Sequence, residues 1–256
     1  MENIRGTQLI QRTFNIIELL SNNPKGLILS EISKKSDIPI STVYRILSFL
    51  NQNDYVRSEK NSGFYYLGPK FALFSSIFLQ GFDFLKEIRP VIEKFNKEFD
   101  ETVHLGILNN THTKVVYIDK IESSRAVRMF SVVGQTVPIH CTALGKSLFS
   151  TLQNHEINEI LKQYTLKKFT DNTITSKAMF LKEIDNVREL GYAVDNKELE
   201  QNIICYGKHF FNGINRNYLS ISISIPDYRI REKNIERIID SLNKTVTSLE
   251  SKLSFF

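Results

Sequence analysis

Short polar and basic side chains gather at one point in the first fifth of the chain. They are Ser41, Thr42, Tyr44 and Arg45. Apolar residues between and after them have the spacing of an amphipathic helix over residues 40–52, which leaves these four exposed. Hydroxyl and guanidinium groups on the N-terminal half of an exposed helix are suited to hydrogen-bonding base edges in a DNA major groove. A solvated face on a small protein-docking unit is the alternative interpretation of the same pattern.

The segments around this helix have the order of a winged helix-turn-helix. Helical spacing predicts a first helix over residues 7–21, with an apolar face made of Leu9, Ile10, Phe14, Ile17 and Leu20. A second, short helix is expected to start with Ser30 as its N-cap and to end near residue 36. Two strands, residues 55–57 and 64–67, flank a turn at 59–63 and predict a β-hairpin wing. In the wing, Arg57 and Lys60 are candidates for phosphate or minor-groove contacts, and Ser30 is a further candidate DNA contact.

The rest of the chain alternates between helices and strands. A strongly apolar helix over residues 69–80 is expected to pack on a partner, such as the same helix of a second chain. Further helices are predicted at 84–99, 142–153, 155–163, 176–190 and 232–253, and strands at 102–109, 113–122, 126–132, 192–194, 203–211 and 218–225. An antiparallel sheet with helices on its faces makes the fold class α+β.

Length, charge and composition limit the class of protein. The 256 residues suit two unequal domains, and the net charge of +5 is compatible with a polyanionic partner. Residues 1–80 carry a net charge of +3, so the positive charge is densest near the N-terminus. No export signal and no apolar run long enough to cross a bilayer is found, so we expect a cytoplasmic protein without a membrane partner.

Two cysteines and nearby histidines could do other chemistry. Cys141 or Cys205 could be the nucleophile of an enzyme, but neither lies in a recognised nucleophile motif. His140, Cys141, Cys205 and His209 could hold zinc, but their spacing fits no compact zinc site. Buried core residues are the simpler interpretation of both cysteines and of His104 and His140. We therefore predict that the protein is not an enzyme and has no metal and no cofactor.

Several motifs together resemble one known family. The stretches are residues 39–47, Tyr55-Val56, 65–68, 101–105, 115–122, 134–146, 191–195 and 220–224. In order and spacing they resemble the IclR (isocitrate lyase regulator) family of bacterial transcription regulators, over about residues 8–250. The resemblance implies a DNA-binding domain at residues 1–68, a linker helix at 69–82, and a GAF-like α/β effector-binding and oligomerisation domain at 83–256.

The resemblance also implies how such a protein works. Family members are homodimers or homotetramers that bind pseudo-palindromic double-stranded operators and respond to small metabolites, often carboxylates such as keto acids or sugar acids. The matching effector positions here are Ala143, Leu144, Asp195, Cys205, Ser222 and Ser224. Repression by operator occlusion is the simpler mechanism, so we expect a repressor. An activator of a catabolic operon with the same architecture is the alternative.

The implied effector residues have plain structural alternatives. Hydroxyls two residues apart on a strand share a face and could bind a ligand together, but Ser222 and Ser224 could also lie on the solvent-exposed face of an edge strand. Asp195 could accept from a ligand hydroxyl or simply cap a turn.

The chain departs from the family around Cys205 and at Ile40. Residues 200–210 lack the family's usual turn, and Lys208-His209 could add positive charge to the site, which suggests an effector larger or more acidic than the simplest keto acids. Ile40 stands where the family often has Lys or Arg, so one phosphate or base contact expected from the resemblance is missing. The resemblance therefore does not define the operator sequence, although it still implies DNA binding.

Overall fold

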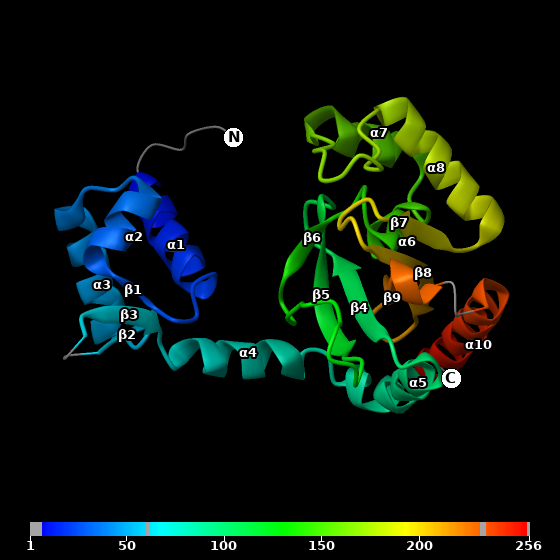
Figure 1. Ribbon diagram of the computed structural model, residues 1–256, viewed down its shortest axis with the longest axis horizontal. Coiled ribbons are helices and arrows are strands. Elements are labelled where there is room, and N and C mark those ends of the chain that lie inside the picture. The colour runs from blue at the N-terminus through cyan, green and yellow to red at the C-terminus, as the bar shows by residue number, and fades with distance from the viewer. Residues whose placement is uncertain (1–6, 60–61, 231–233, 255–256) are drawn as a thin grey trace. The chain divides into compact units, whose positions relative to one another are not determined.

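The computed structural model describes residues 7–59, 62–230 and 234–254. The chain divides into two compact units, residues 1–82 and 83–256. Figure 1 shows a small helical unit with a short sheet and a larger unit built on one broad sheet.

The N-terminal unit holds the helix-turn-helix and the wing. Its elements are α1 (Gln8–Ser21), β1 (Leu27–Ile28), α2 (Leu29–Ser36), α3 (Ile40–Gln52), β2 (Val56–Ser58), β3 (Phe64–Leu67) and α4 (Lys70–Gln80). The strands form an antiparallel sheet in the order β1-β3-β2. A core drawn from α1, α2, α3 and the sheet holds the unit together, and its largest fully buried side chains are Ile16, Leu20, Ile32 and Leu47. Burying each such side chain contributes on the order of 2 kcal/mol.

The first helix forms as predicted, but its buried residues and the start of the second helix differ from the predictions. Leu9, Ile10 and Phe14 are each more than half exposed, and Ile16 takes the central core position instead. The buried positions of α1 are Ile16 and Leu20, four residues apart and so on one face of the helix. The second helix begins at Leu29, one residue before Ser30, because the Glu31 carboxylate accepts the Ile28 backbone N–H at 3.1 Å and caps the helix there.

The C-terminal unit is a six-stranded antiparallel sheet with helices on both faces. The strand order is β6-β5-β4-β9-β8-β7. The strands are β4 (Thr102–Leu108), β5 (Lys114–Ile121), β6 (Thr136–Pro138), β7 (Ala193–Asn196), β8 (Ile203–Asn212) and β9 (Asn217–Pro226). The helices are α5 (Phe84–Phe99), α6 (Ala143–Phe149), α7 (Asn154–Gln163), α8 (Lys177–Leu190), α9 (Asp227–Ile230) and α10 (Ile235–Leu253).

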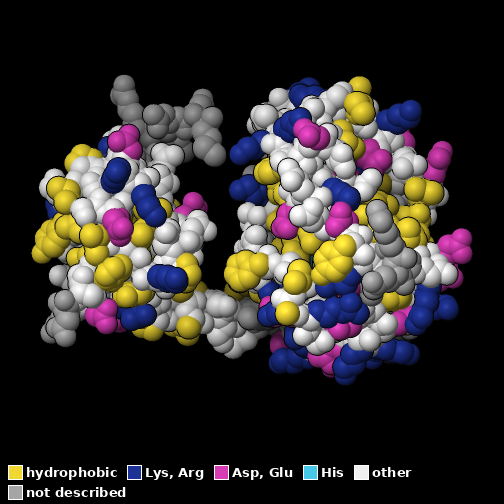
Figure 2. All heavy atoms as spheres, in the orientation of Figure 1, with side chains coloured by type: hydrophobic (Ala, Val, Ile, Leu, Met, Phe, Trp, Pro, Cys, Tyr) yellow, Lys and Arg dark blue, Asp and Glu magenta, His cyan; other side chains and the backbone are white. Residues whose placement is uncertain are grey.

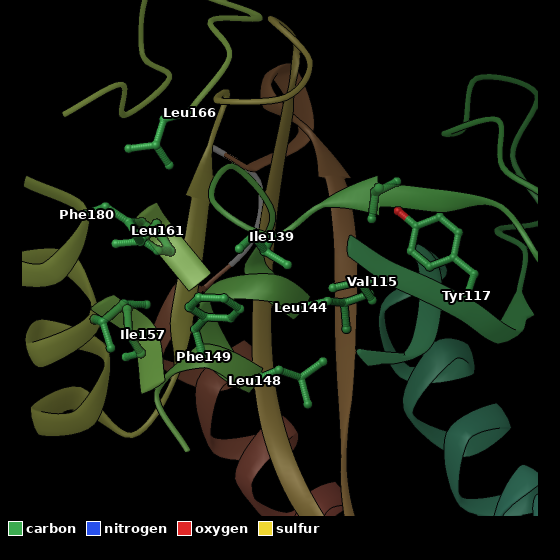
Figure 3. Packing of buried hydrophobic residues seen from close by; sticks show 12 residues of the cluster. Val115, Tyr117, Ile139, Leu144, Leu148, Phe149, Ile157, Leu161, Leu166 and Phe180 are labelled. Carbon is green, nitrogen blue, oxygen red and sulfur yellow. The ribbon is translucent and has the colours of Figure 1, made fainter. Parts of the chain in front are cut away.

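Side-chain contacts assign the helices to the two faces. Arg89 of α5 binds Asp119 of β5 at 2.7 Å, and Lys208 of β8 binds Asn243 of α10 at 2.7 Å, so α5 and α10 cover one face. On the other face, α6 lies against β8 where a Cβ on Gly207 would be only 3.0 Å from Ala143. Figure 3 shows the core of this second face, with the α6 side chains between those of β5 and those of α7 and α8.

Residues 126–132 were predicted as a strand and are not one. Lys120 Nζ donates to the carbonyl of Ser131, Arg229 to that of Val127 at 3.0 Å, and Arg128 to that of Arg125 at 3.2 Å. Because side chains satisfy these backbone groups, β-branched composition alone does not make a ladder here. The edge strand next to β5 is the later segment β6.

Candidate DNA-reading surface and effector site

The α3 helix presents the predicted polar face to solvent. Pro39 directly precedes the helix as its N-cap, and its carbonyl accepts the backbone N–H of Thr42 and of Val43. Ser41, Tyr44 and Arg45 are exposed and Thr42 is half-buried, while the apolar positions Val43, Ile46, Leu47 and Leu50 are buried. The buried stripe holds α3 against the rest of the N-terminal unit, so the polar groups are offered on a rigid support.

The wing and α2 carry the remaining predicted DNA contacts. Arg57 is exposed on β2, and its guanidinium lies 4.2 Å from the ring centroid of Tyr66, its register partner on β3. A guanidinium stacked on an aromatic ring is held in place while its N–H groups still point outward. Ser30 is exposed in the first turn of α2, and Lys60 lies outside the described residues.

In the C-terminal unit, three of the predicted effector residues form one row across neighbouring strands. Asp195 of β7 pairs with Cys205 of β8, and Cys205 pairs with Ser224 of β9. The Cys205 thiol donates to Ser224 Oγ at 3.2 Å. Ser222 lies two residues along β9, on the same face, opposite Gly207. All four side chains are buried, so the interpretation of the serines as the solvent-exposed face of an edge strand is wrong.

The first residues of α6 complete the predicted set. Ala143 packs on Gly207 of β8, and Leu144 points toward Gly106 of β4, where a Cβ would be 3.2 Å from Leu144 Cδ1. Larger residues at the two glycines would push α6 off the sheet. The structure thus brings the six predicted residues to one face of one sheet.

The sequence did not predict the second half of this polar cluster, which consists of His104 and its partners Tyr117 and Ser131. His104 of β4 lies in register with Ser222, is only 1% exposed, and its Nδ1 is 3.4 Å from Ser224 Oγ. Its ring stacks on Tyr117 of β5, with centroids 4.6 Å apart, and its Nε2 is 2.8 Å from Ser131 Oγ. Burial, with the nearby Lys120 ammonium, lowers the pKa of His104 to about 3, so the imidazole is neutral. The i, i+2 spacing of Thr102, His104 and Gly106 was the available signal, but only the pairing of β4 with β9 gives it meaning.

Asp195 is a buried acid with a weakened tendency to ionise. Burial, together with the negative charge of Glu198, raises the pKa of Asp195 to about 7, and the hydrogen bond from the Glu198 backbone N–H keeps the shift from being larger. Beside it, Lys146 of α6 is 1% exposed and binds Glu198 at 2.6 Å and Glu183 of α8 at 2.9 Å. The site therefore contains a half-neutral acid and a neutral imidazole next to a compensated ion-pair cluster.

The cysteines and the other histidines take structural positions. Burial raises the pKa of Cys141 and of Cys205, so neither thiol is a nucleophilic thiolate at neutral pH. His140 is a satisfied core residue, as predicted, with its ring nitrogens 2.9 Å from Tyr164 Oη and 3.0 Å from the Lys167 carbonyl. Among the described residues, no three His, Cys, Asp or Glu side chains are grouped as metal ligands would be.

The extra charge expected from Lys208 does not reach the site. Lys208 points to the opposite face of the sheet from Cys205 and binds Asn243 of α10. His209 is on the same face as Cys205 but lies at the far end of α6, where its Nδ1 is 3.3 Å from Ser150 Oγ. The inference that Lys208 makes the site more positive is therefore wrong, since strand alternation turns its side chain away.

A winged helix-turn-helix unit followed by an α/β unit with a buried polar cluster defines the class of ligand-responsive, DNA-binding regulators. The IclR helix-turn-helix domain matches residues 9–60, and the C-terminal domain of the bacterial transcriptional regulator IclR matches residues 77–251. This chain belongs to the IclR family. It is a DNA-binding transcription regulator and not an enzyme.

Named relatives agree with that assignment over nearly the whole chain. The transcriptional regulator KdgR of Dickeya chrysanthemi is 30% identical over 96% of this chain and 80% of its own length. The transcriptional repressor AllR of Escherichia coli strain K12 is 28% identical over 89% of this chain and 83% of its own length.

The fold is that of solved family members. The crystal structure of Thermotoga maritima IclR is 30% identical, superposes with a TM-score of 0.76, and is matched over 96% of this chain and 98% of that one. In the part of this chain that the structure describes, every helix is too short or too polar to span a lipid bilayer.

Proposed function

We propose that this protein is a transcriptional repressor whose operator binding is controlled by a small carboxylate metabolite, a keto acid or a sugar acid. The observation that carries the proposal is the buried polar row of Asp195, Cys205 and Ser224, continued by His104, in the unit separate from the helix-turn-helix. Hydroxyl, thiol and imidazole groups that lie together in a site closed to water are suited to bind a small polar molecule by hydrogen bonds. Activation of a catabolic operon by the same architecture is the second candidate; the name of the relative AllR favours repression.

The proposal divides the chain into three working parts. Residues 1–68 bind DNA, residues 69–82 form the linker helix, and residues 83–256 bind the effector and support oligomerisation. The operator contacts are assigned to Ser30, Ser41, Thr42, Tyr44, Arg45, Arg57 and Lys60. The effector contacts are assigned to Ala143, Leu144, Asp195, Cys205, Ser222 and Ser224. Such a regulator works in the cytoplasm, where bacterial DNA is.

A homo-oligomer, dimer or tetramer, on a pseudo-palindromic operator is part of the proposal. Support comes from α4, on which Leu73, Phe74, Ile77 and Phe78 are each more than 40% exposed. Figure 2 shows hydrophobic side chains at the surface of the N-terminal unit. An apolar helix of this kind is stable in water when a second copy covers it.

The effector half of the proposal is tested by binding measurements on two matched variants. Pyruvate, glyoxylate, gluconate and glucuronate are titrated calorimetrically into wild-type protein, Ser222→Ala and Ser248→Ala. Ser222 is buried in the cluster, whereas Ser248 is exposed on α10. One acid should bind wild type and Ser248→Ala alike and Ser222→Ala about 5- to 10-fold more weakly, the effect of one neutral hydrogen bond. Equal affinity for all three proteins would reject the assigned site.

A further inference from the structure

Residues 123–135 lie against the polar cluster and are held there by side-chain and backbone hydrogen bonds. Ser123 Oγ donates to the Asp100 carbonyl at 2.8 Å at the start of the segment. Arg229 holds the Val127 carbonyl, and Gly134 donates its N–H to the Tyr117 carbonyl at 2.7 Å at the end. Between these anchors, Ser131 is fully buried while Phe130 is 85% exposed. One side of the segment therefore touches the cluster and the other faces solvent.

The link from the cluster to this segment is His104, which has a hydroxyl partner at each of its two ring nitrogens. The Cys205 thiol donates to Ser224 Oγ, so the single proton of Ser224 is free to go to His104 Nδ1. In the tautomer that uses this proton, Nδ1 is the acceptor nitrogen and the neutral imidazole carries its own proton on Nε2. In that tautomer His104 donates its Nε2–H to Ser131 Oγ, 2.8 Å away, out of the cluster and into the segment.

We propose that His104 is an effector-recognising residue, and that an oxygen of the bound acid replaces Ser131 as the acceptor of its Nε2–H and so releases residues 123–135. The inference rests on the proposed function and adds a residue and a consequence to it. A carboxylate accepts an N–H more strongly than a serine hydroxyl does, which gives the exchange its direction.

The charges around the exchange define the effector further. Lys120 of β5 is the cation next to His104, and it is already shared between the Ser131 carbonyl and Glu122, which it binds at 2.8 Å. Asp195, on the other side of Cys205, adds negative charge whenever it ionises. One carboxylate can be neutralised by Lys120 once Ser131 moves away, whereas a second would be buried without a partner. The ligand class is therefore a monocarboxylic acid with neutral hydroxyl or keto groups.

Two amide substitutions separate the two nitrogens of His104. In His104→Gln the longer amide reaches the place of Nε2, and in His104→Asn the shorter amide reaches that of Nδ1. Both lose the ring that stacks on Tyr117, so each controls for the other in stability. Ser131→Ala removes the competing acceptor without touching His104.

A single fluorescent reporter follows the segment. The sequence contains no tryptophan, so Phe130→Trp, at an exposed position, gives one emission signal from residues 123–135. The full-length reporter protein, alone and combined with each of the three substitutions, is titrated with pyruvate, glyoxylate, gluconate and glucuronate. Tryptophan emission and release from the DNA upstream of its own gene are recorded in parallel, after circular dichroism has shown which variants fold.

At least one acid should change both signals in the reporter protein. His104→Asn should then need at least about 10-fold more of that acid, the effect of losing one hydrogen bond to a charged group, and His104→Gln less than about 3-fold more. Ser131→Ala should respond at equal or lower acid concentrations, because the acid no longer competes with Ser131.

Three results would overturn the inference. An acid that releases DNA at the same concentration from His104→Asn and from the parent would show that His104 makes no effector contact, while the proposed function stands. If His104→Asn does not fold, weaker acid binding by Ser131→Ala would reject the exchange in its place. No response of the parent to any of the acids would reject the carboxylate effector itself, and His104's role with it.

Discussion

The carboxylate of Asp195 accepts the backbone N–H of Glu198 at 2.7 Å, and the Glu198 side chain binds Lys146 Nζ at 2.6 Å. Lys146 is on α6, the helix that begins with Ala143 and Leu144, and it also binds Glu183 of α8. The two sides of the proposed effector site, strand β7 and helix α6, are therefore tied together through one buried ammonium group. A change of charge at Asp195 acts directly on the loop that holds this ion pair.

Asp195 should make a contribution to stability that falls as the pH rises from about 4 to about 7, opposite in sign to the contribution of His104. The folded pKa of Asp195, about 7, lies above the ordinary value of 3.8, so the folded state holds the proton more tightly than the unfolded chain. The contribution is fully present below the unfolded pKa, is lost on ionisation, and is on the order of 2–4 kcal/mol. Urea unfolding at a series of pH values should show that the free energy of unfolding of wild type minus that of Asp195→Asn falls over this range, whereas the same difference for Asp240→Asn, an exposed control on α10, stays constant. The same pH dependence in both variants would contradict the assignment.

Replacing Lys146 by methionine should destabilise the C-terminal unit strongly. The substitution keeps the volume but leaves the Glu198 carboxylate, 5% exposed, without its cation. Breaking a buried pair in this way costs about 3–5 kcal/mol. Lys162→Met is the matched control, because its pair with Glu159 is about two-thirds exposed, and it should change the free energy of unfolding by less than about 0.5 kcal/mol. If the two variants lose similar amounts of unfolding free energy, the buried pair stabilises the protein no more than the exposed pair does.

Arg45→Ala should weaken binding to the operator more than binding to random DNA. A base-edge contact is worth about 1–3 kcal/mol and acts at one position of the sequence. Arg57→Ala should weaken both kinds of DNA alike and reduce the slope of log affinity against log salt by about 1, as expected for a phosphate contact. Fluorescence anisotropy at three salt concentrations measures both effects, with Arg237→Ala of α10 as a control. If Arg45→Ala loses the same affinity for operator and for random DNA, Arg45 contacts a phosphate and not a base edge.

Ile77→Glu should dissociate the proposed oligomer. Ile77 is 56% exposed on α4, and a carboxylate buried there against a second copy would lack a partner. Light scattering after size exclusion should give a smaller mass for Ile77→Glu than for wild type. Ile214→Glu, at a 45% exposed position in the other unit, should keep the wild-type mass. Wild-type mass in Ile77→Glu would exclude α4 as the contact.

The elements predicted best from sequence are those with strong periodicity and clear ends. The bounds of α3 and α5 match the predictions of 40–52 and 84–99, because the apolar spacing is regular and Pro39 and Asp83 precede the helices. Patterns without tertiary information failed elsewhere. Leu9 and Ile10 have the periodicity of a core face but find no core to enter, and residues 126–132 have strand composition but their backbone bonds go to side chains.

The effector site was predictable only where one motif contains the residue. Ala143 and Leu144 lie in a single recognisable stretch, and Ser222 and Ser224 show their shared face by alternation. His104, Tyr117 and Ser131 come from three separate segments, which meet only because β4 lies between β5 and β9 and the 123–135 segment folds back. Strand order depends on pairing between segments far apart in the sequence, so local sequence patterns do not predict it.

The most direct test of the account is the affinity of the purified protein for the DNA upstream of its own gene, measured by anisotropy with and without each monocarboxylic acid. The account predicts specific binding that one acid changes by at least about 10-fold, a coupling free energy of about 1.4 kcal/mol, with no change in binding to random DNA. Specific binding that none of the acids alters, or no preference for that DNA at low salt, would contradict it.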